Sequence, residues 1–157
     1  MIEIYLEKLR FTQSLYVNPY MNRGDSMNNI VENFVVAAKK QDTRNMFMPT
    51  ITSIACDAIR PLYDKWQPTD VEIVFNNLTS IRFYPASKFD ALLSEYNFSK
   101  LGITIFASWE GDPIYVENEH IYIAIHGCET YSIDKEFSSI YTFLDWIMQN
   151  MKQNDPC

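Results

Sequence analysis

Two histidines and a cysteine near residue 125 are the side chains that most suggest chemistry. Residues an even number of positions apart face the same side of a strand, so His120, His126 and Cys128 would share one face. Such a set could form a metal site or a Cys–His pair. However, at 3.3 Å per residue the two histidines would lie about 20 Å apart, too far to bind one zinc ion. We therefore expect solvated strand residues, with no metal or cofactor.

Other catalytic patterns are also weak in this sequence. The C-terminal third is rich in carboxylates, so a glycosidase-like acid/base pair has to be considered, but sequence spacing cannot place two carboxyls across a cleft. There is no GxSxG string, and the four glycines form neither GxGxxG nor GxxxxGK[ST]. We expect a protein that is not an enzyme.

The negative charge is concentrated in the last third of the chain. Residues 1–106 contain 11 acidic and 11 basic residues, whereas residues 107–157 contain nine acidic residues and two basic ones, which gives the net charge of −7. Such a field repels nucleic acid and attracts basic partners. We expect a basic protein partner and no nucleic acid.

The sequence also favours a cytoplasmic location. Its three cysteines are widely spaced and form no CxxC pair, which is typical of free thiols in a reducing compartment. No stretch approaches the roughly 18 apolar residues of a membrane span. The first seven residues include two glutamates and no basic leader, so we expect neither a signal peptide nor a membrane contact.

The first half of the chain has mainly helical periodicity. Residues 2–9 fit a strand and a helix equally well, and residues 16–24 read as a loop. A helix is expected over residues 27–40, capped by Asp25 or Ser26, and a second one after Pro49 that ends or kinks near Pro61. The Arg23-Gly24-Asp25 tripeptide is then a turn followed by a cap, not an adhesion motif.

The second half changes to a period of two. A hairpin is expected over residues 71–83 with its turn at Asn76-Asn77, followed by a helix opened by Ser87 and Asp90. Strands are then expected at residues 102–108, 113–117 and 120–126, and a closing helix capped by Asp134. This order predicts one α+β domain over residues 1–157, with a helical part at 1–70 and a mainly antiparallel sheet and closing helix at 71–151.

Aromatic and acidic side chains supply a candidate binding surface. Tyr141, Phe143 and Trp146 fall off the main apolar stripe of the closing helix, and with further rings they could form a contact patch or widen the core. The further rings are Trp109, Tyr115 and Tyr122. From charge clustering and loop placement, the predicted partner-binding residues are Trp109, Glu110, Asp112, Glu117, Glu119, Glu129 and Asp134.

Four segments between residues 81 and 148 resemble the SUKH superfamily. They are Ile103-Thr104-Ile105-Phe106-Ala107, Gly111-Asp112-Pro113-Ile114-Tyr115-Val116, Ile121-Tyr122-Ile123 with His126-Gly127, and Ile140-Tyr141-Thr142-Phe143-Leu144. The resemblance implies a sheet of about four to six strands with helices packed on one face. It also implies a bacterial immunity protein that binds and neutralises a cognate toxin of a polymorphic or contact-dependent system, often a nuclease or another nucleic-acid-targeting enzyme.

Three functional hypotheses follow. The first is an immunity protein whose acidic residues 110–134 contact a basic toxin domain. The second is a stand-alone regulatory or scaffold domain that uses the same fold to bind another protein. The third and weakest is a small hydrolase or metal enzyme using His126 and Cys128.

Overall fold

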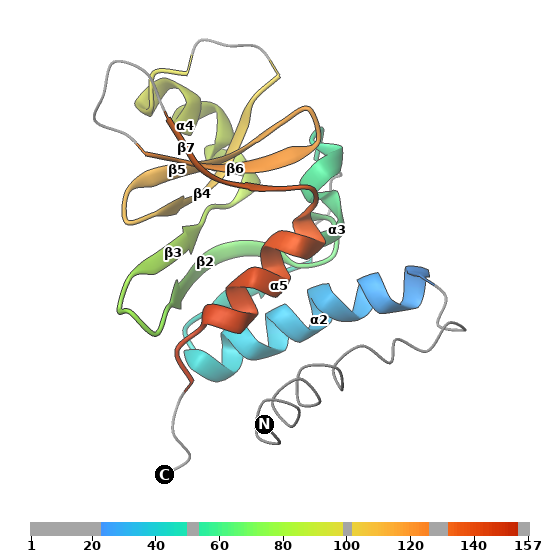
Figure 1. The fold of residues 1–157 in the computed structure, drawn as a ribbon. Helices are drawn as coiled ribbons and strands as arrows, with labels where there is room; N and C mark the ends of the chain where they lie inside the picture. Colours follow the sequence, from blue (N-terminus) through green and yellow to red (C-terminus); the bar gives the residue numbers. More distant parts are fainter. Residues whose placement is uncertain (1–22, 50–53, 99–101, 126–131, 154–157) are drawn as a thin grey trace, which may run out of the picture.

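The computed structural model describes residues 23–49, 54–98, 102–125 and 132–153 (Figure 1). Its helices are α2 (Arg23–Gln41), α3 (Arg60–Tyr63), α4 (Phe89–Glu95) and α5 (Ile140–Asn150), with short 3-10 helices at Asp57–Ile59 and Ala86–Lys88. Its strands are β1 (Met46–Met48), β2 (Gln67–Val74), β3 (Ser80–Phe83), β4 (Thr104–Trp109), β5 (Asp112–Glu117), β6 (His120–Ile125) and β7 (Ser132–Phe137). The predicted α+β class is confirmed, with seven strands rather than four to six.

All seven strands form one antiparallel sheet in which each strand pairs with the next along the chain. The predicted hairpin is present, with Val71 opposite Phe83 and Ile73 opposite Ile81. Its turn includes Leu78, which has a φ of 68°. The three strands expected after residue 101 are found within two residues of their predicted ends.

Helices α2, α3 and α5 cover one face of the sheet, and α2 and α5 lie side by side (Figure 1). Phenylalanine rings connect the layers, because the Phe83 ring packs against Phe34, Phe106 and Phe143 at centroid distances of 5.4 to 6.2 Å. The hydroxyl of the fully buried Tyr63 donates to the backbone oxygens of Tyr84 and Phe106, which connects α3 to the residue after β3 and to β4. Burial raises the pKa of that phenol well above its usual value.

The opposite face is covered in part by α4. A second, smaller core there contains Leu92, Ile105 and Tyr115. Both β4 and β5 contain four consecutive buried residues, as expected for strands that are covered on both faces. Helices on one face were expected, and the structure adds this shorter helix on the other.

The segment before the closing helix differs from the prediction. Asp134 lies inside β7, an additional edge strand, and does not cap the helix. Helix α5 is instead capped by Ser139, whose side chain accepts a hydrogen bond from the Thr142 backbone, and the Thr142 hydroxyl completes a capping box. The hydroxyl of the residue directly before Ile140 was therefore a better cap signal than an aspartate inside a strand.

The region after Pro49 was also predicted wrongly in part. Residues 54–56 are not helical, and α3 starts at Arg60 with Pro61 in its first turn. Proline fits there because the first N–H groups of a helix have no partner inside the helix. Strand β1 and the first residues of β2 also belong to the part that was expected to be helical.

Two helix starts were also placed differently. Helix α2 begins at Arg23, so Asp25 and Ser26 lie inside the helix instead of preceding it. At α4, the 3-10 helix runs directly into the α-helix, and Lys88 occupies the cap position without a side-chain cap bond, which replaces the expected box of Ser87 and Asp90. Residues 2–9 fall outside the described part of the chain.

Candidate protein-binding surfaces

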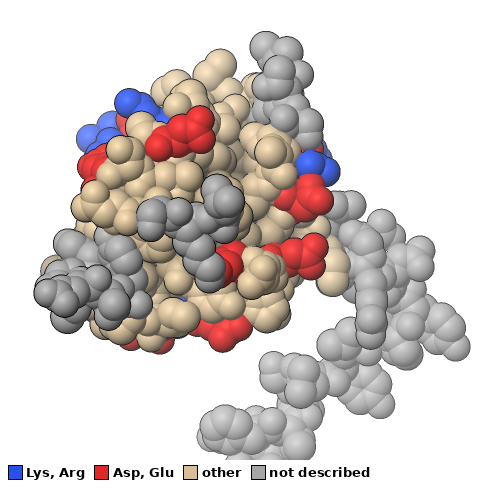
Figure 2. Space-filling view, turned by 90° about the horizontal axis from the view of Figure 1, so that it is seen from above, with Lys and Arg blue, Asp and Glu red and all other residues tan. Residues whose placement is uncertain are grey.

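The structure divides the predicted acidic surface between two ends of the sheet. Glu110 lies in the β4–β5 turn, whereas Glu119 lies in the β5–β6 turn. Because β5 is six residues long, these turns are separated by about 20 Å along the strand. Seen from above, the acidic side chains form several separate groups and not one continuous patch (Figure 2).

The other predicted residues follow the same division. Trp109 and Asp112 flank the β4–β5 turn and are opposite one another in the ladder. Glu117 ends β5 opposite His120. Asp134 is exposed in the edge strand β7, and Glu129 lies outside the described residues. Within the described set, therefore, Trp109, Glu110 and Asp112 form one group and Glu117 and Glu119 another.

Trp109 belongs to an aromatic group that closes one end of the core, here called the tryptophan cluster: Phe75, Trp109 and Trp146. The three rings contact one another at centroid distances of 5.3 to 5.7 Å in edge-on arrangements. Trp109 Nε1 donates to the Thr79 hydroxyl at 2.9 Å, and Lys135 Nζ lies about 6 Å from both indole centroids. The indole N–H and the exposed ring faces are thus engaged within the chain itself.

A shallow hollow of about 280 Å³ opens beside the tryptophan cluster. Its lining residues are Phe75, Asn76, Asn77, Trp109, Lys135, Trp146 and Asn150. Phe143, which the sequence suggested as a surface aromatic, is fully buried, and Tyr141 and Trp146 pack partly buried against the main core. The wide apolar face of α5 therefore serves mainly to pack the helix against the sheet.

Glu110 stabilises the same end of the sheet. One of its carboxylate oxygens accepts a hydrogen bond from the Ser80 backbone N–H at 2.5 Å, and the Glu110 N–H donates to the Ser80 carbonyl. Gly111 follows in the turn with a φ of 88°, a left-handed conformation that favours glycine. The Glu110 carboxylate thus has a structural role that its charge alone did not reveal.

A second aromatic group lies on the opposite sheet face, here called the tyrosine face: Tyr115, Glu117, His120, Tyr122 and Glu136. Tyr115 is opposite Tyr122, which in turn is opposite Glu136, so these three side chains form one row across β5, β6 and β7. Glu117 and His120 are opposite one another and form the next row. The sequence pointed to the tyrosines, but Glu136 was missed because β7 was not recognised as a strand.

The tyrosine face combines stacked rings with carboxylates. The Tyr115 and Tyr122 rings stack at 5.4 Å and 30°, and the His120 and Tyr122 rings at 6.3 Å and 27°. His120 Nδ1 lies 2.6 Å from Glu136 Oε1, and the side chains of His120 and Glu136 are 45% and 53% exposed. The Glu136 carboxylate and the His120 ring are therefore both open to solvent.

Tyr115 is the buried anchor of this face. Its side chain packs against the Phe98 ring at 5.1 Å and is only 5% exposed as a residue. Burial raises the pKa of the Tyr115 phenol above its usual value, and the negative charge of Glu117 raises it further. The phenol thus stays neutral beside the carboxylate and holds the row in place.

The arrangement of side chains around His120 does not support a metal site. His120 is paired with Glu136, while His126 and Cys128 lie outside the described residues. Across the ranges that the structure describes, no three His, Cys, Asp or Glu side chains are grouped so that they could hold a metal ion.

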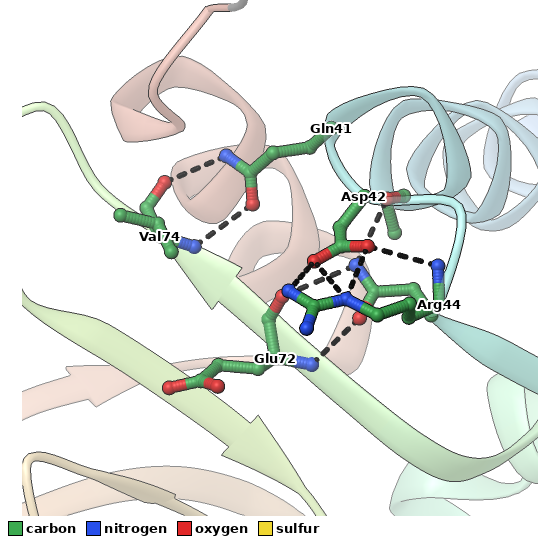
Figure 3. A network of polar contacts seen from close by, with 7 residues as sticks. Gln41, Asp42, Arg44, Glu72 and Val74 are labelled. Atoms are coloured by element: carbon green, nitrogen blue, oxygen red, sulfur yellow. Dashed lines mark hydrogen bonds and ion pairs between the residues drawn. The ribbon is translucent and has the colours of Figure 1, made fainter.

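A polar network bonds the backbone of β2 where that strand extends past its partner β1 (Figure 3). The Gln41 carboxamide bonds both the N–H and the carbonyl of Val74, at 2.8 and 2.7 Å, and Asn45 bonds both groups of Glu72. These amides replace a neighbouring strand, so the backbone groups of Glu72 and Val74 are satisfied. Hydrogen bonds from Arg44 lower the pKa of Asp42 to about 2 in the same network, which we assign to structure.

Neither a search for membrane-spanning helices nor a comparison with known proteins assigns a function. Of the helices in the described residues, none is both long enough and apolar enough to cross a lipid bilayer. No family model, no curated protein and no solved structure matches the chain.

Proposed function

We propose that this protein is an immunity protein of the SUKH type, which binds a cognate bacterial toxin and neutralises it without catalysing a reaction. The proposal has its origin in the sequence resemblance over residues 81–148. An antiparallel sheet that is followed by a closing helix is compatible with it. The second candidate, a regulatory or scaffold domain, would use the same surfaces on an endogenous protein.

The observation that carries the proposal is the uneven distribution of charge over the fold. Between Asp112 and Phe137, the described residues include five carboxylates and a single lysine, Lys135. The carboxylates are Asp112, Glu117, Glu119, Asp134 and Glu136. At the other end of the strand order, Asp70 in β2 is paired with Arg82 in β3, and Asp42 is paired with Arg44 in the segment between α2 and β1.

This distribution favours a cationic partner. A nuclease has to present a basic surface to phosphates, and a protein with concentrated carboxylates can bind or screen that surface. Complementary charge also steers the two proteins together, which accelerates association more than it increases affinity. We therefore expect an association rate that falls steeply as salt is added.

Co-expression tests the proposal directly. The full chain is produced together with a candidate toxin encoded by a neighbouring gene, and survival is compared with that of cells that produce the toxin alone. We expect survival and a stable complex, whose association rate falls at least ten-fold between about 20 and 200 mM salt. Growth arrest despite abundant folded chain would contradict an immunity role, and a stable complex with an endogenous protein would favour the scaffold hypothesis.

A further inference from the structure

The tyrosine face combines stacked rings with two carboxylates, of which Glu117 is half-buried and Glu136 is exposed. We propose that it is the docking surface for an arginine of a protein partner. The guanidinium extends the ring stack at its His120 end and pairs with Glu117 and Glu136. This inference deepens the proposed function, on which it rests for the identity of the partner.

The ring arrangement fits a guanidinium group. Tyr115, Tyr122 and His120 form a stack whose neighbouring planes differ by no more than 30°. A guanidinium is planar and weakly hydrated, so it extends such a stack, whereas a lysine ammonium is a compact and strongly hydrated charge. Tyr115 is buried and pinned by Phe98, so little side-chain freedom is lost at this end of the stack when a partner binds.

The charges around the rings are complementary to arginine. Glu136 accepts from His120, and its side chain is still 53% exposed. In the described part of the chain, no lysine or arginine forms an ion pair with Glu119 or Glu136. Lys135 belongs to the opposite face, because it is opposite Ile123 and its ammonium lies over the tryptophan cluster.

An exposed apolar side chain continues the surface. Ile133 is opposite Ala124, so it lies on the same face as Tyr122 in the row next to Tyr122 and Glu136. It is 56% exposed. Arginine carries three methylene groups before its charged end, and these pack on such an apolar surface while the guanidinium reaches the carboxylates.

A titration of the full chain with a hexa-arginine peptide tests the surface. The probe is added at about 20 mM salt, and backbone amide shifts are followed by NMR. We expect the largest shifts at residues 115–122 and 134–137, and a roughly ten-fold loss of affinity in the double variant Glu117→Gln/Glu136→Gln. Shifts spread evenly over the molecule would overturn the proposal.

A matched variant separates a site from a general charge effect. Glu72→Gln/Asp145→Asn removes the same two charges from exposed positions on β2 and α5, and amides keep the hydrogen bonds that these side chains accept from Ser80 and Gln149. We expect this variant to bind the probe within two-fold of the unchanged chain. Equal weakening of both double variants would show that binding follows net charge, and the proposal would be wrong.

Stacking makes a separate contribution. The hexa-arginine peptide should bind about two- to five-fold more tightly than a hexa-lysine peptide, and Tyr122→Leu should remove this difference. Equal binding of the two peptides to the unchanged chain would exclude stacking on the rings.

The co-expression assay separates this inference from the proposed function. If the unchanged chain protects cells and Glu117→Gln/Glu136→Gln protects them equally well, the docking surface is wrong and the immunity role stands. If the unchanged chain gives no protection while the hexa-arginine peptide still binds the tyrosine face, the surface stands and the immunity role is wrong.

Discussion

The tryptophan cluster and the tyrosine face have similar compositions and different environments. In each, aromatic rings lie next to charged side chains: Lys135 beside the tryptophan cluster, and Glu117 and Glu136 on the tyrosine face. In the tryptophan cluster, the ring N–H of Trp109 is bonded to Thr79 and a lysine covers two ring faces, so the interactions are completed within the chain. On the tyrosine face, the rings lie beside the exposed carboxylate of Glu136. The two regions therefore differ less in their number of rings than in the charged groups beside those rings. We use that difference to separate a packing role from a proposed binding role.

Truncation of Trp109 should have the largest effect on stability. Trp109→Ala should lower the free energy of unfolding by about 2–4 kcal/mol, because the variant leaves a cavity against Phe75 and Trp146. Urea denaturation followed by circular dichroism measures the change. Tyr122→Leu is the control on the other face and should cost less than about 1.5 kcal/mol, since it keeps an apolar side chain at a half-buried site. Similar losses in both variants would contradict the division between the two regions.

A substitution in the β5–β6 turn should change stability and binding in opposite directions. Glu119 has a φ of 67°, in the left-handed region that glycine occupies at Gly111 in the β4–β5 turn. Glu119→Gly should therefore raise the free energy of unfolding by about 1 kcal/mol. It should also weaken hexa-arginine binding about two-fold, because a carboxylate next to the tyrosine face is lost.

Asn118 supplies the control for the turn. Its φ is 50°, but asparagine tolerates the left-handed region, so Asn118→Gly should change stability by less than Glu119→Gly does. A Glu119→Gly variant that is less stable than the unchanged chain would show that the side chain supports the fold and is not retained for binding.

A substitution of Lys135 tests whether the contacts of the tryptophan cluster are all made within the chain. Lys135→Met keeps an unbranched side chain over Trp109 and Trp146 and removes the cation, so unfolding should become easier by about 0.5–1 kcal/mol. Because Lys135 lies on the other face, hexa-arginine affinity should stay within two-fold. A several-fold gain in affinity would indicate that Lys135 repels the probe and that the two regions are not independent.

The smallest expected effect concerns alkaline pH. The pKa of Tyr115 is raised in the folded state, so folding retains a proton that the unfolded chain loses near pH 10, and this stabilisation disappears as the pH rises through the folded-state pKa. Tyr115→Phe should flatten the fall in unfolding free energy above pH 10 only in part, because the pKa of the buried Tyr63 is raised too. An unchanged slope in Tyr115→Phe would show that the tyrosine face does not contribute.

The sequence predicted the central strands well because their signals are local. Alternation around Ile73, Ile81 and Ile123 located the hairpin and the meander, and only the start of β2, at Gln67, differs from its predicted position by more than two residues. Residues 132–137 gave no such signal, since an edge strand with exposed Ile133 and Asp134 does not show a clean alternation. The strand depends on pairing with β6, and periodicity does not report pairing.

The candidate surfaces were harder to predict than the strands. Charge counting identified the acidic third of the chain, but it could not show that consecutive turns of a meander lie at opposite ends of the sheet. Nor could it show that the Glu110 carboxylate bonds the backbone of Ser80, or that His120 and Glu136 come together from different strands. Such neighbours depend on register, which tertiary packing determines.

Amide hydrogen exchange of the chain alone and in complex with the toxin that we propose as its partner would test the central claim most directly. The account predicts slower exchange in the complex at residues 115–122 and 134–137. It also predicts no change around Asn76, Asn77 and Trp109. Protection confined to the tryptophan cluster, with exchange at the tyrosine face unaltered, would contradict it.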